Sequence, residues 1–439
     1  MILPELRVEY SDKKVTAWGG MKLMHDLVER MGIKGYLQTL PLPARGSNHG
    51  YDPEQILECF WVSVWIGASR FTHSEFLRYD KALQEIFGWA RVPSQSTYSR
   101  FFHKFSWKRN AEVFESLFRW FFEQVSFDNL TLDLDSTVMT RYGSQEGAKV
   151  GYNPQKPGRA SHHPLMAFMA DLRMVVNAWL RPGNTGSSSN YKNFLTETLS
   201  ILQNKRVGLV RADSGFFSED FCNEMEDRKL NYITAVPMYP NIKSEIGSQR
   251  GWVEVGDGIE VVEWEYRLPS WKKSRRMIAV RKQVEKYPKA SGKLLLFDDD
   301  LFPRYRYSMF VTNLDLPAEL VWNLYRDRGD AENRIKELKY DFGADSFCLS
   351  EFFATEASFR FIMMAYNLMS VFRQLMLKAK NQAMLSTLRF KCFALGAWIC
   401  NHATKRILKI ALAKEKRAWL DGLFNIARNT APPYNFSNA

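Results

Sequence analysis

The sequence predicts an α/β fold in which a sheet-based core is flanked by helical regions at both ends of the chain. Between about residues 128 and 237, periodicity indicates three strands, then a helix, a strand, a helix and a strand. An antiparallel start of three strands followed by parallel additions is the order expected of a ribonuclease-H-like core. Further strand-like segments follow and predict a β-rich insertion. The predicted core segments are strands Leu130–Val138, Pro164–Asp171, Arg173–Leu180, Val207–Asp213 and Tyr232–Val236, and helices Phe194–Leu202 and Glu219–Asp227.

Residues 1–125 are predicted to form a helical region that contains a candidate helix-turn-helix. Pro53 suits the first turn of a helix, and the segment Pro93–Phe105 begins with small polar residues and ends with basic ones. In a helix-turn-helix unit, the N-terminal residues of the second helix reach base edges. Ser96, Arg100 and Lys104 are therefore candidate DNA contacts. The alternative is an ordinary capped helix whose phenylalanines belong to the core.

Residues 126–237 form the first part of the predicted core and carry candidate metal-binding carboxylates. Asp133 and Asp135 lie on one face of a predicted strand, because side chains alternate along a strand. Asp213 ends another predicted strand. In open α/β sheets, ligands bind outside the carboxyl ends of the strands. These aspartates are therefore expected at one edge of the sheet.

The segment Gly151–Arg159 has the composition of a loop, since it mixes glycine, proline, asparagine and basic residues. Lys156 and Arg159 are candidate contacts to a DNA backbone near the first aspartates. The adjacent His162 and His163 have no third histidine nearby. We therefore expect them to be structural or DNA-contacting residues rather than zinc ligands.

Residues 238–316 are predicted to form a β-rich insertion domain, and residues 317–345 the second part of the core. Asp213 and Glu332 are 332 − 213 = 119 residues apart, far more than one helix and a connection require. Lys272 and Lys273 are candidate contacts to a phosphate backbone, and a solvated hairpin edge is the equal alternative. The candidate strands of the insertion are Gly258–Tyr266, Arg276–Val280, Lys293–Phe297 and Tyr305–Thr312.

Tyr325, Arg328, Glu332 and Lys339 follow one another at intervals of three, four and seven residues. Such intervals return to one face of a helix, so a phenol, two cations and a carboxylate are expected to project together. A solvated, charged helix is the alternative. With the aspartates, Glu332 completes a set of three carboxylates, which can bind two divalent cations for an in-line displacement at a phosphate.

Residues 346–439 are predicted to be helical, with amphipathic segments at Glu351–Leu377 and Leu388–Leu408. This region is a candidate dimerisation surface, and a helical cap over the sheet is the alternative. The net charge of +12 favours a polyanionic partner. Five scattered cysteines show neither zinc spacing nor a disulfide framework, which fits a reducing cytoplasm. We expect no signal peptide and no membrane span.

The chain resembles the DDE insertion-sequence transposases over most of residues 20–410. Their Tyr-x2-Arg-x3-Glu-x6-Lys signature matches Tyr325, Arg328, Glu332 and Lys339 without a gap. Asp135-Ser136-Thr137 resembles the family's first catalytic aspartate motif, and Gln145–Gly147 through Gly151–Arg159 resembles the loop typical of one branch. Arg181–Asn184 and Arg211–Phe216 also fit the family. The branch that the chain resembles is called insertion sequence 1380, or transposase DDE group 1.

The resemblance implies a catalytic triad of metal ligands formed by Asp135, Asp213 and Glu332. Asp133 is a lower-ranked alternative to Asp135. By the same resemblance, Arg328 and Lys339 hold a phosphate near the scissile bond, and Tyr325 donates a hydrogen bond to it. The implied cofactor is a pair of Mg²⁺ or Mn²⁺ ions.

The implied function is that of a cut-and-paste DNA transposase of a bacterial insertion sequence, located in the cytoplasm and associated with the nucleoid. Such an enzyme binds terminal inverted repeats, cleaves the ends by hydrolysis and hairpin formation, and joins the 3′-hydroxyl ends to target DNA. The implied partners are double-stranded DNA at the transposon ends and the target, and a second copy of the chain in a homodimeric synaptic complex.

Hairpin formation requires a base to leave the stack, and an aromatic side chain can receive that base. The candidates are Trp252, Trp264, Trp271 and Trp322, each with a role in the core as the alternative. Two other function classes remain open. A metal-dependent ribonuclease-H-like nuclease without strand transfer needs the same three acids, whereas a domesticated DNA-binding regulator needs only the N-terminal helices.

Overall fold

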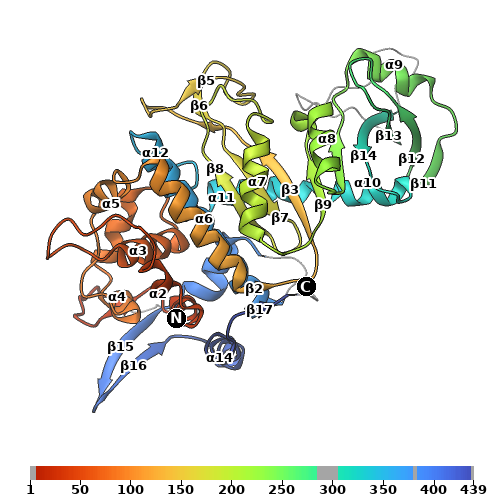
Figure 1. Ribbon diagram of the computed structural model, residues 1–439. Helices are drawn as coiled ribbons and strands as arrows, with labels where there is room; N and C mark the ends of the chain where they lie inside the picture. The colour runs from red at the N-terminus through yellow and green to blue at the C-terminus, as the bar shows by residue number, and fades with distance from the viewer. Residues whose placement is uncertain (1–5, 284–304, 379–382, 437–439) are drawn as a thin grey trace. The chain divides into compact units, whose positions relative to one another are not determined.

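The computed structural model describes residues 6–283, 305–378 and 383–436, and the chain divides into two compact units. The helical unit comprises Met1–Leu117 and Glu337–Tyr434, and the sheet unit comprises Phe118–Lys336 and Asn435–Ala439. Two helices, α6 (Trp107–Glu123) and α11 (Gly329–Tyr340), run from one unit into the other (Figure 1). The N-terminal and C-terminal regions, expected as separate parts, thus belong to the same unit.

The sheet unit is built on one large mixed sheet. The sheet has the predicted antiparallel start, because β3 pairs antiparallel with β7, and β7 pairs antiparallel with β8. It also has the predicted parallel additions, because β3 pairs parallel with β9, and β9 pairs parallel with β10. The mixed α/β prediction is confirmed. Within the described residues the nine strands lie in the order β11 (Val253–Gly256), β12 (Ile259–Tyr266), β13 (Arg275–Gln283), β14 (Tyr305–Thr312), β10 (Tyr232–Ala235), β9 (Val207–Ala212), β3 (Leu130–Ser136), β7 (Leu165–Met169) and β8 (Met174–Trp179) (Figure 1).

Strand β3 is buried on both faces, although it carries two aspartates. Leu132 and Leu134 are both 0% exposed, and on the opposite face Asp133 and Asp135 are 0% and 6% exposed. Burial on both faces is typical of a central strand paired in parallel with a neighbour. Because buried charges require partners, the elements next to β3 have to supply cations.

The strands of the expected insertion continue the central sheet and do not form a separate compact unit. β14 pairs antiparallel with β10, and β13, β12 and β11 follow outward from β14. The same segment contains a helix that strand periodicity did not predict, α9 (Pro240–Ser248). The predicted strand Lys293–Phe297 lies outside the described residues. Local alternation predicted the strands, but the long-range pairing of β10 with β14 leaves no local signal.

Short elements complete the sheet unit. The two predicted core helices are confirmed as α7 (Tyr191–Leu202) and α8 (Glu219–Asp227). A small three-stranded sheet follows β3, in the order β4 (Met139–Thr140), β6 (Ala160–His162) and β5 (Lys149–Val150). Gly183 packs directly on it, because a Cβ atom at this position would lie 2.1 Å from the carbonyl oxygen of Ser161. The remaining elements are β2 (Val125–Ser126), the 3-10 helix η2 (Ser214–Phe216) and α10 (Ala318–Arg326).

The helical unit is packed around α3 (Pro53–Ile66) and α12 (Phe352–Phe372), which are buried along most of their length. Nevertheless, no helix in the described ranges is long and apolar enough to cross a membrane. Trp61 and Trp65 of α3 donate hydrogen bonds from their indole nitrogens to carbonyl oxygens of α12. The surrounding elements are α1 (Met21–Met31), α2 (Ile33–Leu37), η1 (Phe71–Arg78), α4 (Lys81–Phe87), α5 (Gln95–Phe102), η3 (Arg373–Leu377), α13 (Leu385–Leu388), η4 (Arg389–Phe393) and α14 (Lys414–Asn429).

The prediction of one amphipathic helical stretch over Leu388–Leu408 is wrong. After α13 and η4, the chain forms a hairpin of β15 (Ala397–His402) and β16 (Lys405–Ile410). Near the start of the chain, β1 (Val15–Thr16) adds a third strand beside β15. Strand propensity depends on cross-strand contacts, here mainly those between β15 and β16, more than on local pattern. The last strand, β17 (Tyr434–Asn435), crosses the boundary between the units.

Candidate active site

Asp135 and Asp213 lie next to each other at one edge of the central sheet. β3 and β9 are parallel, with Leu134 opposite Ala212, and each aspartate is the next residue in its strand direction. The Oδ1 atom of Asp213 accepts a hydrogen bond of 3.0 Å from the backbone N–H of Gly215, which fixes the turn after β9. The charge of Asp213 contributes to a raised pKa of Asp135, so the two carboxylates interact electrostatically.

The carboxyl group of Asp135 is buried, and among the described residues its ion-pair partner is Arg328. Its Oδ2 atom lies 3.1 Å from Nη2 of Arg328, and its Oδ1 atom accepts a hydrogen bond of 2.8 Å from the backbone N–H of Ser136. Burial raises the pKa of Asp135 to about 6, the charge of Arg328 opposes that rise, and the charge of Asp213 adds to it. One arginine therefore does not compensate the two carboxylates, and further positive charge at this edge would be stabilising.

Asp133, the alternative ligand, is already occupied by an ion pair. Nε and Nη2 of Arg211, on the adjacent β9, donate to the two carboxylate oxygens of Asp133 at 2.6 and 2.9 Å. A third donor of Arg211, Nη1, bonds the carbonyl oxygen of Leu324 in α10. Arg211 was not predicted to have a role, although a cation within an apolar strand beside an aspartate-bearing strand is a recognisable signal. The ion pair leaves Asp135 as the available carboxylate of β3.

The single helix expected to carry Tyr325, Arg328, Glu332 and Lys339 is interrupted. Tyr325 belongs to α10, Arg328 lies in the turn that follows, and α11 begins at Gly329. Glycine is a poor helix former, which favours an interruption at this point. The argument that all four residues share one helical face is therefore wrong for Tyr325 and Arg328.

Tyr325 and Arg328 nevertheless belong to the cluster around Asp135. Arg328 is 7% exposed, and its Nη2 atom also donates to the carbonyl oxygen of Leu134 at 3.3 Å. Burial alone would lower the pKa of Arg328, but the charges of Asp135 and its neighbours give a net rise. Burial raises the pKa of Tyr325 to about 12, and the charge of Arg328 opposes that rise. Four of the predicted residues thus interact: Asp135, Asp213, Tyr325 and Arg328.

Glu332 and Lys339 are not drawn into this cluster. Glu332 is exposed in the first turn of α11, and within the described residues its side chain forms no hydrogen bond or ion pair. Lys339 is half-buried two turns further along α11, in the portion that belongs to the helical unit. Among residues 6–283, 305–378 and 383–436, no group of three or more His, Cys, Asp or Glu side chains is close enough to hold a metal ion.

Arg334 anchors the first turns of α11. This arginine is 4% exposed, and its Nη2 atom donates to the carbonyl oxygen of Ala170 and to Asp330 Oδ2, both at 2.8 Å. Asp330 also lies 2.9 Å from Nε of Arg173. Sequence reasoning missed Arg334, because its partners at the end of β7 are remote in the sequence. These contacts hold the helix that presents Glu332 against the turn after β7.

The two adjacent histidines have structural partners. Arg141 donates from Nε to Nδ1 of His162 at 2.9 Å, so Nε2 of His162 donates to the carbonyl oxygen of Glu146 at 2.9 Å. Burial lowers the pKa of His162 to about 4, and the charge of Arg141 contributes. Nε2 of His163 lies 3.1 Å from Oγ of Ser136, the residue after Asp135. His163 thus connects the small sheet to the carboxylate edge.

Expected DNA contacts in the helical unit lie on or just after α5. Ser96, Arg100 and Lys104 are exposed, and Lys104 Nζ donates to the carbonyl oxygen of Ala44 at 3.1 Å. On the other side of α5, Phe101 and Phe102 are buried. The phenylalanines therefore belong to the core, as the alternative interpretation expected, and the polar residues on the other side of α5 are accessible to solvent.

Expected DNA contacts in the sheet unit are also exposed. Lys156 and Arg159 lie over the ring of Tyr142, and Lys272 is exposed after Trp271. Lys273 forms an ion pair of 3.2 Å with Glu226. Lys273 therefore has part of its charge compensated within the protein.

The candidate tryptophans differ in their surroundings. Trp271 is 6% exposed and packs against Phe217 and the guanidinium of Arg275. Trp322 packs against Phe310. Trp264 and Trp322 have buried indole nitrogens without a hydrogen-bond partner in the described residues. Trp252 is half-buried, and the Arg281 guanidinium lies 4.3 Å from its ring centroid. The core alternative fits Trp271 best.

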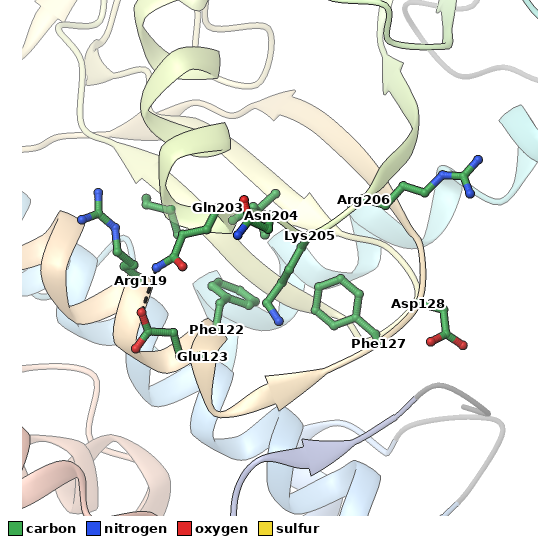
Figure 2. A pocket seen from close by; sticks show the side chains of 11 residues that line it. Arg119, Phe122, Glu123, Phe127, Asp128, Gln203, Asn204, Lys205 and Arg206 are labelled. Carbon is green, nitrogen blue, oxygen red and sulfur yellow. Dashed lines mark hydrogen bonds between the residues drawn. The ribbon is translucent and has the colours of Figure 1, made fainter.

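A pocket of about 300 Å³ lies near the opposite ends of β3 and β9 from the aspartates. Figure 2 shows the hydrogen bond from Gln203 to Glu123 and Lys205 beside the ring of Phe127. The hydrogen bond is 2.8 Å long, and the Lys205 nitrogen lies 4.7 Å from the ring centroid. None of the expected catalytic residues is among the described residues that line this pocket. Its remaining lining residues are Arg119, Phe122, Asp128, Ile201, Leu202, Asn204 and Arg206.

The chain matches one family model and is similar to several solved structures. The family model described as "Transposase DDE domain group 1" matches residues 3–430. No curated protein matches the chain. A similar solved structure is a cryo-EM structure of the piggyBac transposase synaptic complex with hairpin DNA. The identity is 12% and the TM-score 0.42, over 94% of this chain and 85% of that chain, and at this TM-score the likeness carries no further argument.

Proposed function

Because this chain belongs to the transposase DDE domain group 1 family, we propose that it is the cut-and-paste transposase of a bacterial insertion sequence. The chain is a DDE transposase, an enzyme that cleaves DNA and transfers strands. In the proposed sequence it binds the terminal inverted repeats, and water attacks the phosphodiester at each transposon end to release a 3′-hydroxyl. That hydroxyl attacks the opposite strand to form a hairpin and, after the hairpin is opened, attacks target DNA.

One observation carries the proposal: Asp135 and Asp213 directly follow the paired residues Leu134 and Ala212 of two parallel strands. This is the edge of an open sheet where ligands bind. The order of the antiparallel and parallel strands around β3 supports a ribonuclease-H-like core, with β11 to β14 as its β-rich extension. The buried ion pair of Asp133 with Arg211 supports the choice of Asp135 over Asp133.

The carboxylates of Asp135, Asp213 and Glu332 are suitable ligands for divalent cations. Asp135 and Asp213 also lie close enough together to share a metal site. Their oxygens are the ligands that Mg²⁺ and Mn²⁺ prefer. The raised pKa of Asp135 shows a shortage of positive charge, which a bound cation would relieve. Asp135, Asp213 and Glu332 would hold the ions, which when bound activate the attacking oxygen and stabilise the leaving oxygen. Glu332 is exposed one turn into α11 and forms no cluster with the aspartates among the described residues, so it has to approach them when the site assembles.

The neighbouring residues have positioning tasks in this proposal. Arg328 opposes the rise in the pKa of the buried Asp135, and its own Nε–H is buried without a hydrogen-bond partner within the described residues. Tyr325 stays protonated at neutral pH, because its pKa is raised to about 12, and can donate a hydrogen bond to the DNA. Lys339 would hold a phosphate further along α11. Synapsis of two ends requires two active sites, so we propose a homodimer.

The test compares isosteric variants of the three acids on a duplex that carries a transposon end. We expect Asp135→Asn, Asp213→Asn and Glu332→Gln to lose Mg²⁺-dependent and Mn²⁺-dependent cleavage by at least about 100-fold, because each removes a charged metal ligand. Gel-shift affinity should change less than about threefold, since binding depends on many phosphate contacts. The matched control is Asp315→Asn, an exposed aspartate of the sheet unit, and it should cleave normally.

The products separate the proposed function from its alternatives. Accumulation of hairpin and joined products supports a transposase of this mechanism. Nicking without hairpin or joining would indicate a nuclease, and binding without cleavage by the wild-type chain would indicate a DNA-binding regulator. Wild-type cleavage by any one of the three variants would remove that residue from the proposed triad.

A further inference from the structure

Tyr142 combines an exposed aromatic ring with two exposed cations, in a place that the catalytic cluster does not use. It is 69% exposed and comes two residues after β4. Lys156 Nζ lies 5.2 Å from the ring centroid, and the guanidinium carbon of Arg159 lies 5.9 Å from it. Within the described part of the chain, neither cation forms an ion pair with a carboxylate, so both charges are available to an external anion. We call Tyr142, Lys156 and Arg159 the basic-aromatic patch.

The patch is held on a fixed scaffold. Asn153 is 5% exposed; its Nδ2 donates to Thr140 Oγ1 at 3.1 Å, and its Oδ1 accepts from the backbone N–H of Lys156 at 3.0 Å. The backbone N–H of Arg141 donates to the carbonyl oxygen of Ala160 at 2.9 Å, which ties the chain before Tyr142 to the chain after Arg159. A preformed site loses less conformational entropy when it binds a ligand.

The chain connection limits the distance between the basic-aromatic patch and Asp135. Tyr142 is 142 − 135 = 7 residues from Asp135, and an extended chain spans at most about 3.6 Å per residue, or about 25 Å in total. The other end of the small sheet is attached to the same edge, because His163 follows β6 and bonds Ser136. Since one DNA strand advances about 3.4 Å per nucleotide, the patch can reach DNA no more than about seven nucleotides from a phosphate at Asp135.

We propose that the basic-aromatic patch binds an unpaired nucleotide of the DNA strand that enters the active site. The base stacks on the ring of Tyr142, and Lys156 and Arg159 contact the phosphates on either side of it. An aromatic ring beside cations is the combination that binds single-stranded nucleic acid, whereas duplex DNA presents no free base face. The proposal rests on the proposed function, because strand separation next to the cleavage site supplies the unpaired nucleotide.

The test measures binding of a single-stranded oligonucleotide by the full chain in EDTA, with 2-aminopurine as a fluorescent base that stacking quenches. We expect Tyr142→Ala to lose the quenching and to bind the single strand roughly tenfold or more weakly, and Tyr142→Phe to keep both. Lys156→Gln and Arg159→Gln should each reduce the slope of log affinity against log salt by about 0.7. Affinity for the fully paired duplex should change less than about threefold in Tyr142→Ala.

Tyr152→Ala is the matched control, because Tyr152 is 73% exposed in the same segment and has neither lysine nor arginine over its ring among the described residues. It should quench and bind like the wild type, and all variants should melt at the wild-type temperature. Wild-type quenching by Tyr142→Ala, or an equal loss in Tyr152→Ala, would overturn the proposal. These outcomes do not depend on catalysis, so a chain that binds the single strand as expected but never cleaves a transposon end contradicts only the proposed function.

Discussion

Asp133 and Asp135 show how neighbours decide the role of identical side chains. Both are buried on the same face of β3, two residues apart. Asp133 receives two hydrogen bonds from Arg211, and its charge is compensated within the fold. Asp135 has one contact with Arg328 and lies near a second carboxylate. The first aspartate therefore stabilises the fold, and the second is held in a state that favours binding of another cation.

The two aspartates should differ strongly in their contribution to stability. Asp133→Asn leaves the buried cation of Arg211 without a counter-ion, so we expect a loss of about 3–5 kcal/mol in the free energy of unfolding. Asp135→Asn also leaves a buried arginine, Arg328, without its counter-ion, but it removes a carboxylate that burial disfavours, so the two effects offset and the loss should be below about 1 kcal/mol. Urea denaturation at pH 7 in EDTA measures both. Equal losses would show that the two carboxylates have equivalent environments.

The raised pKa of Asp135 predicts a distinct dependence of stability on pH. A carboxyl group whose pKa is higher in the folded state, at about 6 compared with an ordinary 3.8, binds its proton more tightly there. This group therefore destabilises the fold above pH 6, and the penalty disappears as the pH falls from 6 to about 4. In EDTA, the contribution should approach 3 kcal/mol at most. Urea denaturation from pH 4 to 7.5 should show this component in the wild type and not in Asp135→Asn, and parallel profiles would contradict the assignment.

At the scale of elements, local periodicity predicted the strands and helices of the core, although β3 and β9 pair with each other from distant parts of the sequence. β3, β9, α7 and α8 agree with the segments expected from periodicity. The break between α10 and α11 has a local cause, Gly329, but the charged repeat around it suggested a continuous helix. β15 and β16 form a hairpin with each other in a segment whose pattern suggested a helix, and β1 adds two residues beside β15. The sequence thus predicted the strands that hold Asp135 and Asp213, and it could not predict that Glu332 stays exposed.

Packing of α3 against α12 depends on two tryptophans that sequence pattern alone describes only as apolar. Trp61 and Trp65 are each 1% exposed, and their indole nitrogens donate to Phe361 and Ala365, four residues apart, at 2.9 and 3.0 Å. The two donors are one helical turn apart in α3, and the two acceptors are one helical turn apart in α12. The two bonds therefore fix the axial register of α3 against α12 in addition to the apolar contact.

Trp61→Phe and Trp65→Phe test this register. Each variant removes a buried hydrogen bond, worth about 1 kcal/mol, and leaves a cavity that costs a similar amount, so we expect a loss of about 2–3 kcal/mol in the free energy of unfolding. Trp419→Phe in α14 is the control, because Trp419 is 41% exposed, and it should change stability by less than about 0.5 kcal/mol. If the buried and exposed variants unfold at the same urea concentration, the indole bonds contribute nothing to stability.

At the scale of the whole molecule, the division into units could not be predicted from the order of segments. The first 117 residues and the residues from Glu337 to Tyr434 form one unit, although more than 200 residues separate them. Composition shifts along the chain indicate where a segment changes type, but they do not show which distant segments share a core. The net charge of +12 is a property of the whole chain, and the candidate DNA contacts occur in both units.

Salt dependence of duplex binding distinguishes the cations that contact phosphate from those that the protein compensates internally. Each phosphate contact contributes about 0.9 to the slope of log affinity against log salt, so Lys272→Gln should lower the slope by about 0.9. Lys273→Gln should lower it less, because Glu226 lies 3.2 Å from the Lys273 nitrogen and shares its charge. The Lys104 amine donates to the neutral carbonyl oxygen of Ala44, which leaves its charge uncompensated, so Lys104→Gln and Arg100→Gln should both resemble Lys272→Gln. Titrations of a labelled duplex from 50 to 300 mM salt measure these slopes, and an unchanged slope in both Arg100→Gln and Lys272→Gln would place the DNA on other surfaces of the two units.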